Sequence, residues 1–390
     1  MGEQNPVIAC ARQGAKKYKE EELAYIRRFA SIDSPSLDEE ASRTTVEVVE
    51  EMLGKLSGIQ IQREYAPGCG YNVIARLKPE HPDGKIVLSA HTDTVFRRGE
   101  AAAHPYHEEG DRAYGLGVAD CKGGLVVSIY AVRIMQEAGL LPNKEIVFLF
   151  TCDEEVGAPS GNKVFQRELE GTDMAFFFEP SREENGVLTQ RKGWCRVMAD
   201  VTGRQAHTGI NYLDGRSAIT EIAHLIQRFY ESAVPEQGIY FNAGKVENDD
   251  PLNIVSGHAC VEFCVRVANK ADMDTVYRIV DKLEKEPPYI DGVSRAFRIE
   301  PHLPMERTKA NVALYEKVRS IGQLLGHQLP EQKSGGSGDA SFFAYHGIPT
   351  VDGLGVYMYK IHSVEESMRI SSVEEKTCLF GTILGCLDSL

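Results

Sequence analysis

Three short apolar runs in this chain each end in side chains that can bind a metal ion. The runs are 86–90, followed by His91 and Asp93; 145–150, followed by Asp153, Glu154 and Glu155; and 174–178, followed by Glu179. A helical pattern at 122–137 separates the first two runs. Buried strands that alternate with helices predict a largely parallel α/β sheet. The carboxyl ends of such strands meet at one edge of the sheet, which is where ligands bind.

A different pattern occupies the middle of the chain. Its elements follow the order β-α-β-β-α-β, which is typical of a ferredoxin-like fold. They are expected at 195–201, 216–233, 239–246, 259–267, 271–286 and 295–300. Elsewhere helices are expected at 20–31, at 39–56 (starting from Ser34 or Ser36), at 311–325 and from Val373, with a strand at 348–352. We therefore predict a discontinuous catalytic domain of residues 1–190 and 302–390, with an inserted domain of residues 191–301.

Composition narrows the class of protein. The 390 residues carry a net charge of −14 and show no basic stripe, which argues against a nucleic-acid partner. No apolar run is long enough for a membrane span or a signal peptide, and Pro6 disfavours myristoylation at Gly2. The nine cysteines are scattered and include no CxxC pair. These features predict a cytoplasmic protein that does not bind membranes.

The polar residues at the predicted sheet edge indicate a metal site. Carboxylates gathered at one edge repel each other unless a cation lies among them. Asp120 joins this group because it precedes a helix, in a stretch rich in glycine. A mixture of imidazole and carboxylate suits zinc, manganese or cobalt, and we see no cysteine at a metal-facing position, which argues against a structural zinc site. Each signal alone also fits an ordinary surface pair or a solvated loop, but their occurrence at three successive strand ends favours a catalytic metal site.

Seven stretches of the sequence together resemble the aminoacylase/carboxypeptidase G family of dizinc metallopeptidases, which includes acetylornithine deacetylase and succinyl-diaminopimelate desuccinylase. They are SAHTDTV at 89–95, YGLGVADCKGG at 114–124, TCDEEVG at 151–157, FFEP at 177–180, GRQAHTG at 203–209, Asp339-Ala340 and IHS at 361–363. They cover nearly the whole chain, and the pattern is most similar to the carboxypeptidase G type. The resemblance implies a zinc-peptidase-type catalytic domain and an inserted ferredoxin-like lid and dimerisation domain.

The resemblance also implies roles for individual residues. One zinc would be held by His91 and Glu179, the other by Glu155 and His362, with Asp120 bridging both. Glu154 would be the general base, Asp93 would orient His91, and His207 would assist catalysis. Substrate contacts would come from Asn253, Arg266, Gly336 and Asp339. The sequence departs from the family pattern at two places. Gly338 stands where many relatives have Ser or Thr before the aspartate. Carboxypeptidase G has a lysine that helps to select glutamate, and the matching position here, near Gly186, has none.

Three functions remain open from the sequence. The first is cleavage of an amide bond next to a free carboxylate, in a short peptide or N-acyl amino acid, by a water activated by two Zn²⁺ ions (Co²⁺ or Mn²⁺ as alternatives). The second is a dizinc aminopeptidase or dipeptidase, which the presence of Glu179 rather than Asp disfavours. The third is a non-catalytic binding protein of the same fold. A Rossmann protein is disfavoured because the glycines at 115 and 117 lack a third partner. We also expect a homodimer formed through the inserted domain, with His207 acting across it.

Overall fold

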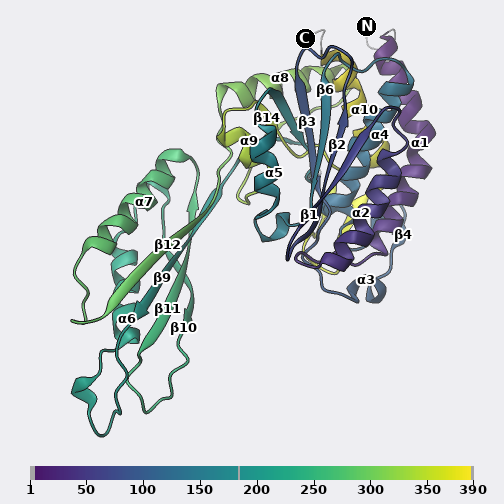
Figure 1. The fold of residues 1–390 in the computed structure, drawn as a ribbon. Coiled ribbons are helices and arrows are strands. Elements are labelled where there is room, and N and C mark those ends of the chain that lie inside the picture. Colours follow the sequence, from purple (N-terminus) through teal and green to yellow (C-terminus); the bar gives the residue numbers. More distant parts are fainter. Residues whose placement is uncertain (1–4, 183–184, 388–390) are drawn as a thin grey trace. The chain divides into compact units, whose positions relative to one another are not determined.

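A computed structural model describes residues 5–182 and 185–387 of the chain (Figure 1). Arg191–Glu306 and Ser334–Ser337 form one compact unit, and the rest of the described chain forms a second, larger unit. Within these described ranges, no helix combines the length and the hydrophobicity needed to cross a lipid bilayer.

A six-stranded sheet forms the centre of the larger unit. Its strands, in spatial order, are β1 (Gln60–Ala66), β2 (Gly70–Leu77), β6 (Glu145–Thr151), β3 (Lys85–His91), β7 (Thr172–Phe177) and β14 (Thr350–Val351). The last four run parallel, whereas β1 and β2 are antiparallel at one edge. This confirms the predicted α/β fold with a mostly parallel sheet. The β1–β2 hairpin was not predicted, because β1 is largely exposed and carries no apolar run.

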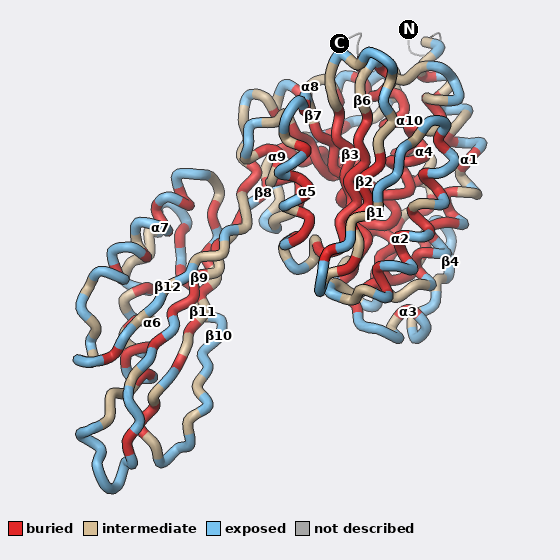
Figure 2. Tube along the Cα trace, viewed as in Figure 1, coloured by how far each residue is buried: buried red, intermediate tan, exposed pale blue. Residues whose placement is uncertain are grey.

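Helices cover both faces of this sheet, which explains why its inner strands β6, β3 and β7 are mostly apolar. Their bounds are α1 (Pro6–Ala30), α2 (Glu39–Leu53), α4 (Gly124–Glu137), α5 (Gly161–Glu168), α8 (Lys309–Leu324), α9 (Ala340–Tyr345) and α10 (Ser371–Cys386). Buried positions concentrate in the inner strands of the sheet, whereas the edge strand β1 is largely exposed (Figure 2).

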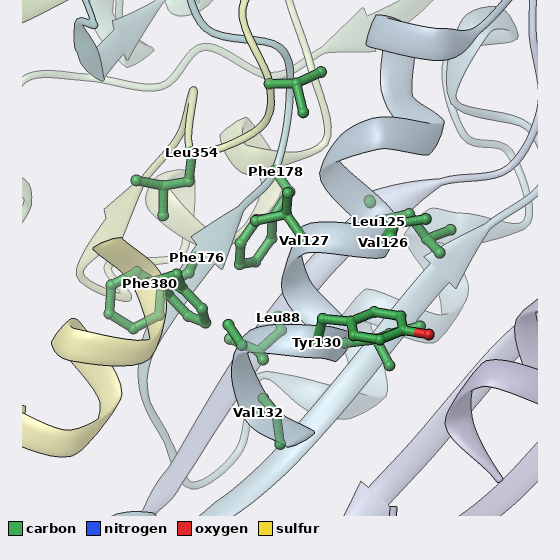
Figure 3. Close-up of a cluster of buried hydrophobic side chains, with 14 of the residues drawn as sticks. Leu88, Leu125, Val126, Val127, Tyr130, Val132, Phe176, Phe178, Leu354 and Phe380 are labelled. Carbon is green, nitrogen blue, oxygen red and sulfur yellow. The ribbon is translucent and has the colours of Figure 1, made fainter. Parts of the chain in front are cut away.

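Strand β7 and the residue after it show the two faces most clearly. The rings of Phe176 and Phe178 lie 5.2 and 4.7 Å from Phe380 of α10, on the face that also holds α4 (Figure 3). Phe177 points the other way, 6.3 Å from Phe165 of α5 and close to α9. Because neighbouring residues of a strand face opposite sides, one aromatic run is buried in two separate cores.

Two helix starts differ from the sequence prediction. Helix α1 begins at Pro6 rather than at residue 20, because the side chain of Asn5 caps the backbone N–H of Val7 and proline suits the first helical turn. Helix α2 begins at Glu39, but its cap is Asp38, which accepts from the N–H of Ala41, and neither of the two expected serines. It ends at Leu53, three residues before the predicted end.

A small second sheet in the larger unit was also not predicted. It joins β15 (Met358–Tyr359), β16 (Ser367–Arg369), β5 (Arg112–Tyr114) and β4 (His107–Glu109), all antiparallel. Its strands have two or three residues each, too short for a periodic pattern. The sheet brings the segment that contains His362 next to the segment that leads to Asp120.

The smaller unit has the predicted ferredoxin-like order. It runs β9 (Gly193–Thr202), α6 (Ala218–Glu231), β10 (Asn242–Glu247), β11 (His258–Val267), α7 (Lys270–Lys285) and β12 (Ser294–His302). The strands pair antiparallel in the order β10-β11-β9-β12. Phe229 of α6 packs 4.4 Å from Phe263 of β11, so the helices cover one face of the sheet. The glycine-rich segment Ser334–Ser337 belongs to this unit, and Arg266 of β11 donates to the carbonyl of Gly335 at 3.5 Å.

Candidate metal centre

The ends of three parallel strands supply most of the candidate ligands. His91 is the last residue of β3, and Glu154 and Glu155 lie in a 3₁₀ turn three residues after the end of β6. Glu179 follows β7 by two residues. The register pairs His91 with Thr151 and Ser89 with Phe177, so all three strands end at the same edge. The sheet edge predicted from sequence is therefore formed.

Asp120 lies between the two histidines. Its Oδ1 is 3.2 Å from Nε2 of His91, and its Oδ2 is 3.1 Å from Nε2 of His362. Helix α4 begins at Gly124, two residues after the predicted start at 122, and the π-helical segment before it, Val118–Gly123, is interrupted by non-helical backbone angles at Asp120 and Cys121. This break in the helix directs the buried Asp120 carboxylate to the sheet edge. A carboxylate with a different imidazole at each oxygen has the arrangement of a bridging ligand.

His362 enters the site from the far end of the chain. It has a left-handed backbone (φ 60°) in the connection between β15 and β16. Its Nε2 is also 3.4 Å from Oε2 of Glu155. Hydrogen bonds to Asp120 and then Glu155 raise the pKa of His362 to about 10. This imidazole, uninformative on its own in the sequence, is thus next to two carboxylates.

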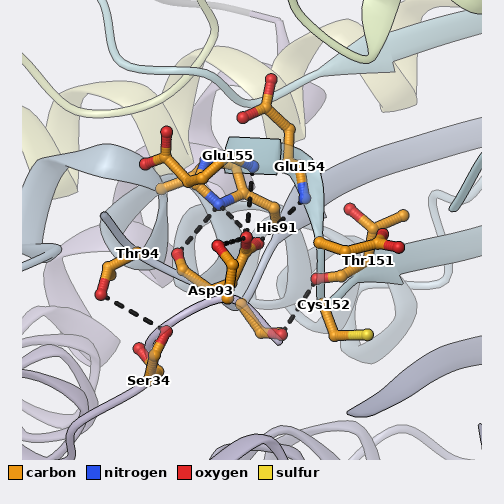
Figure 4. A network of polar contacts seen from close by, with 12 residues as sticks. Ser34, His91, Asp93, Thr94, Thr151, Cys152, Glu154 and Glu155 are labelled. Carbon is orange, nitrogen blue, oxygen red and sulfur yellow. Dashed lines mark hydrogen bonds and ion pairs between the residues drawn. The ribbon is translucent and has the colours of Figure 1, made fainter. Parts of the chain in front are cut away.

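Asp93 ties His91 to the turn after β6. Its Oδ1 lies 3.3 Å from Nδ1 of His91, and its two oxygens accept from the backbone N–H groups of Glu154 and Glu155, each at 3.2 Å (Figure 4). The hydroxyl of Ser36 donates to the same carboxylate at 2.6 Å. This geometry fixes the imidazole orientation and leaves Nε2 facing Asp120 and Glu179, which lies 3.7 Å away.

The electrostatics of the cluster favour a bound cation. Burial alone lowers the pKa of His91, but the negative groups around it, including Asp120 and Asp93, raise it well above its usual value. Burial raises the pKa of Asp120, yet His362 and His91 together hold it below its usual value. The pKa of Glu154 is raised by loss of solvent and by the charge of Glu179. Such a field of carboxylates stabilises positive charge among them, and imidazole with carboxylate is a donor set suited to zinc.

The position of Cys121 differs from the expectation that no cysteine faces the metal site. Its Sγ and the ligand atoms of His91 and Glu179 all lie within 4.8 Å of one another, so the expectation of no metal-facing cysteine is wrong. The thiol also lies 3.0 Å from the carbonyl oxygen of Phe178, and burial raises its pKa well above the usual value. The sequence placed this residue at a helix start, whereas the π-helical segment turns it toward the sheet edge.

The remaining predicted residues fall into two groups. Asp339 is buried in the larger unit, where its carboxylate accepts from Oγ1 of Thr151, at the end of β6, at 3.0 Å. Burial raises its pKa to about 7. The others, His207, Asn253, Arg266 and Gly336, belong to the smaller unit. There, the carbonyl of Asn253 accepts from the N–H of Thr208 at 3.0 Å, next to His207, whose Nδ1 accepts from Gly209 at 3.1 Å.

Glu366 is a site residue that the sequence analysis missed. It is buried against the loop that carries Asp120, although it follows the exposed Glu365 in the sequence. Nothing in the sequence indicates that one of these neighbouring glutamates is buried and the other exposed. Glu366 is buried because the short strand β16, which follows it, pairs with β5.

The fold and the donor set are those of a metallopeptidase. The chain belongs to peptidase family M20/M25/M40, whose sequence profile matches residues 87–384. It is 26% identical to carboxypeptidase G2 of Pseudomonas sp. (strain RS-16) over 357 residues, 90% of this chain and 85% of that protein. This family membership confirms the predicted enzyme class.

Solved structures share the fold over nearly the whole chain. Aminopeptidase PepT from Bacillus cereus superposes with a TM-score of 0.74 at 22% identity, covering 94% of this chain and 98% of that one. The YXEP protein of Bacillus subtilis, described as a dinuclear metal-binding peptidase, gives a TM-score of 0.66 at 15% identity, covering 95% and 98%.

Proposed function

We propose that this protein is a dizinc hydrolase that cleaves an amide bond next to a free carboxylate. The observation that carries the proposal is the position of Asp120, with one carboxylate oxygen facing His91 and the other facing His362. His91 and Glu179 would complete one metal site, and Glu155 and His362 the other. When bound, two divalent ions supply the polarisation of the scissile carbonyl and the acidification of water that amide hydrolysis requires.

The chain's own residues would then orient ligands and move protons. Glu154 would take a proton from the attacking water and give it to the leaving amine, which a carboxyl with a raised pKa can do at neutral pH. Asp93 would keep Nε2 of His91 available for metal by holding the opposite nitrogen. His207 would donate a hydrogen bond to the developing oxyanion.

Recognition of a carboxylate by Arg266 would make the enzyme a carboxypeptidase or an N-acyl-amino-acid amidohydrolase. Its guanidinium has the planar fork that matches a carboxylate, and it is exposed on β11. The name of carboxypeptidase G2 is consistent with this activity. A dizinc aminopeptidase or dipeptidase is the second candidate, supported by the fold shared with PepT. A non-catalytic binding protein is disfavoured, because no proposed ligand or base is missing from the sequence.

A homodimer formed through the smaller unit is part of the same proposal. Among the described residues, strand β10 pairs with β11 on one side and with no strand on the other, which leaves an edge that a second copy can extend. Large apolar side chains of the smaller unit are highly exposed, including Ile210, Leu213 and Leu252. We also propose a cytoplasmic location, since all nine cysteines are free thiols. Light scattering of the purified protein tests the dimer.

A substrate screen tests the proposed reaction. The zinc-loaded enzyme should hydrolyse N-acyl amino acids or N-blocked dipeptides with a free C-terminal carboxylate and should fail on the corresponding C-terminal amides. Turnover that needs a free amine and ignores the carboxylate would favour the aminopeptidase. Metal analysis of the same protein should give about two divalent ions per chain, whereas full activity without metal would refute the proposal.

A further inference from the structure

Glu366 is a buried carboxylate with three backbone donors. Its Oε2 accepts from the N–H of Gly117 at 3.0 Å, and its Oε1 accepts from the N–H groups of Ala119 and Asp120 at 3.0 and 3.1 Å. All three donors belong to the loop and π-helical segment that present Asp120. The side chain is buried, so water does not compete for these three bonds.

The loop needs this partner because its own backbone cannot satisfy the three donors. Gly117 has a left-handed backbone (φ 75°), and Asp120 departs from helical angles, so a regular helical ladder does not run through these residues. Buried N–H groups without an acceptor are costly, and a single carboxylate here supplies acceptors for all three.

The same residue is tied to the segment that carries His362. Its backbone N–H donates to the carbonyl of Ser363 at 2.9 Å, which closes a turn directly after His362. Its own carbonyl accepts from the N–H of Gly115 at 3.2 Å, and the next residue, Ser367, pairs with Tyr114 between β16 and β5. Glu366 therefore connects two segments that are far apart in the sequence.

We propose that Glu366 is a positioning residue that sets the separation between Asp120 and His362 before a metal binds. The inference rests on the proposed function, since both residues are metal ligands there. Asp120 lies in one of the two connected segments and His362 in the other. Oδ2 of Asp120 is 3.1 Å from Nε2 of His362. Without the three carboxylate bonds, the two segments are still joined by backbone bonds between β16 and β5, but the loop that carries Asp120 is no longer held, and the second metal site loses its preset spacing.

The variant Glu366→Gln tests the proposal with almost no change of shape. The glutamine side chain has one carbonyl oxygen, which can accept either from Gly117 or from Ala119 and Asp120. Its NH₂ group then faces the remaining backbone N–H, and two donors cannot form a hydrogen bond. We expect about 10- to 100-fold weaker Co²⁺ or Zn²⁺ binding at the second site, the range for lost partners of metal ligands. The visible absorption spectrum of the Co²⁺-loaded protein should change, and kcat should fall more than KM rises. Glu366→Asp, which keeps the charge on a shorter side chain, should recover part of the affinity.

The matched control is Glu365→Gln. Glu365 is the adjacent glutamate, its side chain is 64% exposed, and it pairs with Lys360. This change should leave metal affinity and the Co²⁺ spectrum as in wild type. Amide hydrogen exchange of the metal-free protein gives a readout independent of activity, because Gly117, Ala119 and Asp120 should exchange faster in Glu366→Gln alone.

The outcomes separate the inference from the proposed function. A folded Glu366→Gln protein with wild-type metal affinity, spectrum and exchange rates would overturn the positioning role of Glu366 while two metals still bind the wild-type chain. If Glu366→Gln does not fold, a Glu366→Asp protein indistinguishable from wild type in metal affinity would overturn it equally. Wild-type protein that binds no divalent metal would instead overturn the proposed function and the metal-positioning role together.

Discussion

Replacing Lys376 with methionine should stabilise the larger unit, by an amount that depends on pH. Lys376 lies in α10 and is fully buried, and its Nζ has no hydrogen-bond partner within the described chain. Its Nζ lies 5.0 Å from the centre of the Tyr357 ring. Burial lowers the pKa of this amine from 10.5 to about 7, because the neighbouring Glu375 only partly offsets the loss of water.

The magnitude follows from proton linkage. Between pH 7 and pH 10.5 the unfolded chain keeps the proton on Lys376 while the folded chain releases it, so the unfolded state binds more protons and stability rises with pH. With these two pKa values, the lysine costs about 4 kcal/mol of folding free energy at pH 7 and about 2 kcal/mol at pH 9. Below the folded pKa both states are charged, and the cost becomes constant. Methionine has a similar shape and no proton to lose, so the variant should be more stable at both pH values, with an advantage about 2 kcal/mol smaller at pH 9.

Urea unfolding of wild type and Lys376→Met at the two pH values measures this difference. Far-UV circular dichroism follows the secondary structure of both units, most of whose helices lie in the larger one, while fluorescence of Trp194, the only tryptophan, follows the smaller unit and should not shift. Lys16→Met, at an exposed position of α1, is the control and should show no pH-dependent advantage. A destabilised Lys376→Met protein, or a stability difference that is equal at pH 7 and pH 9, would show that the amine is charged and well solvated in the folded state.

Further predictions concern the proposed site. Glu154→Gln should keep both metals and lose about 10²- to 10⁴-fold in turnover, as for a general base, while Glu155→Gln should weaken metal binding itself, which metal analysis beside steady-state kinetics will distinguish. His207→Ala should lower turnover about 10²- to 10³-fold, and mixing it with Glu154→Gln should restore activity if His207 acts across a dimer; proven subunit exchange without recovery would exclude that arrangement. Arg266→Lys should raise KM for carboxylate substrates and leave C-terminal amides unaffected, and an equal effect on both would remove Arg266 from carboxylate recognition.

The sequence predicted the elements whose burial is uniform. The β3, β6 and β7 strands are apolar on both faces, so their positions and the sheet edge could be recognised from local pattern. Their parallel pairing follows from the helices between them. The ferredoxin-like order of the smaller unit could also be recognised locally, because each of its elements has its own periodic pattern of apolar residues.

The parts that escaped prediction depend on contacts between distant segments. Glu366 and Glu365 look alike in the sequence, and only the pairing of β16 with β5 buries the first. Cys121, just before the helix expected from residue 122, faces the sheet edge because the backbone departs from helical angles at Asp120 and Cys121. Lys376 is buried beside Tyr357, which lies 19 residues earlier in the chain and outside α10. No local pattern contains this information.

The order of the ligands along the chain has a consequence for biosynthesis. His91, Asp120, Glu155 and Glu179 leave the ribosome long before His362, and Glu366 meets the loop at Gly117 across 249 residues of sequence. Domains tend to fold from the N-terminus during translation, so the nascent sheet displays a half-built, strongly anionic edge until the final segment arrives. On the proposed assignment, the second metal is acquired only by a nearly finished chain. A polypeptide truncated before residue 362 should then have one incomplete metal site and no hydrolytic activity.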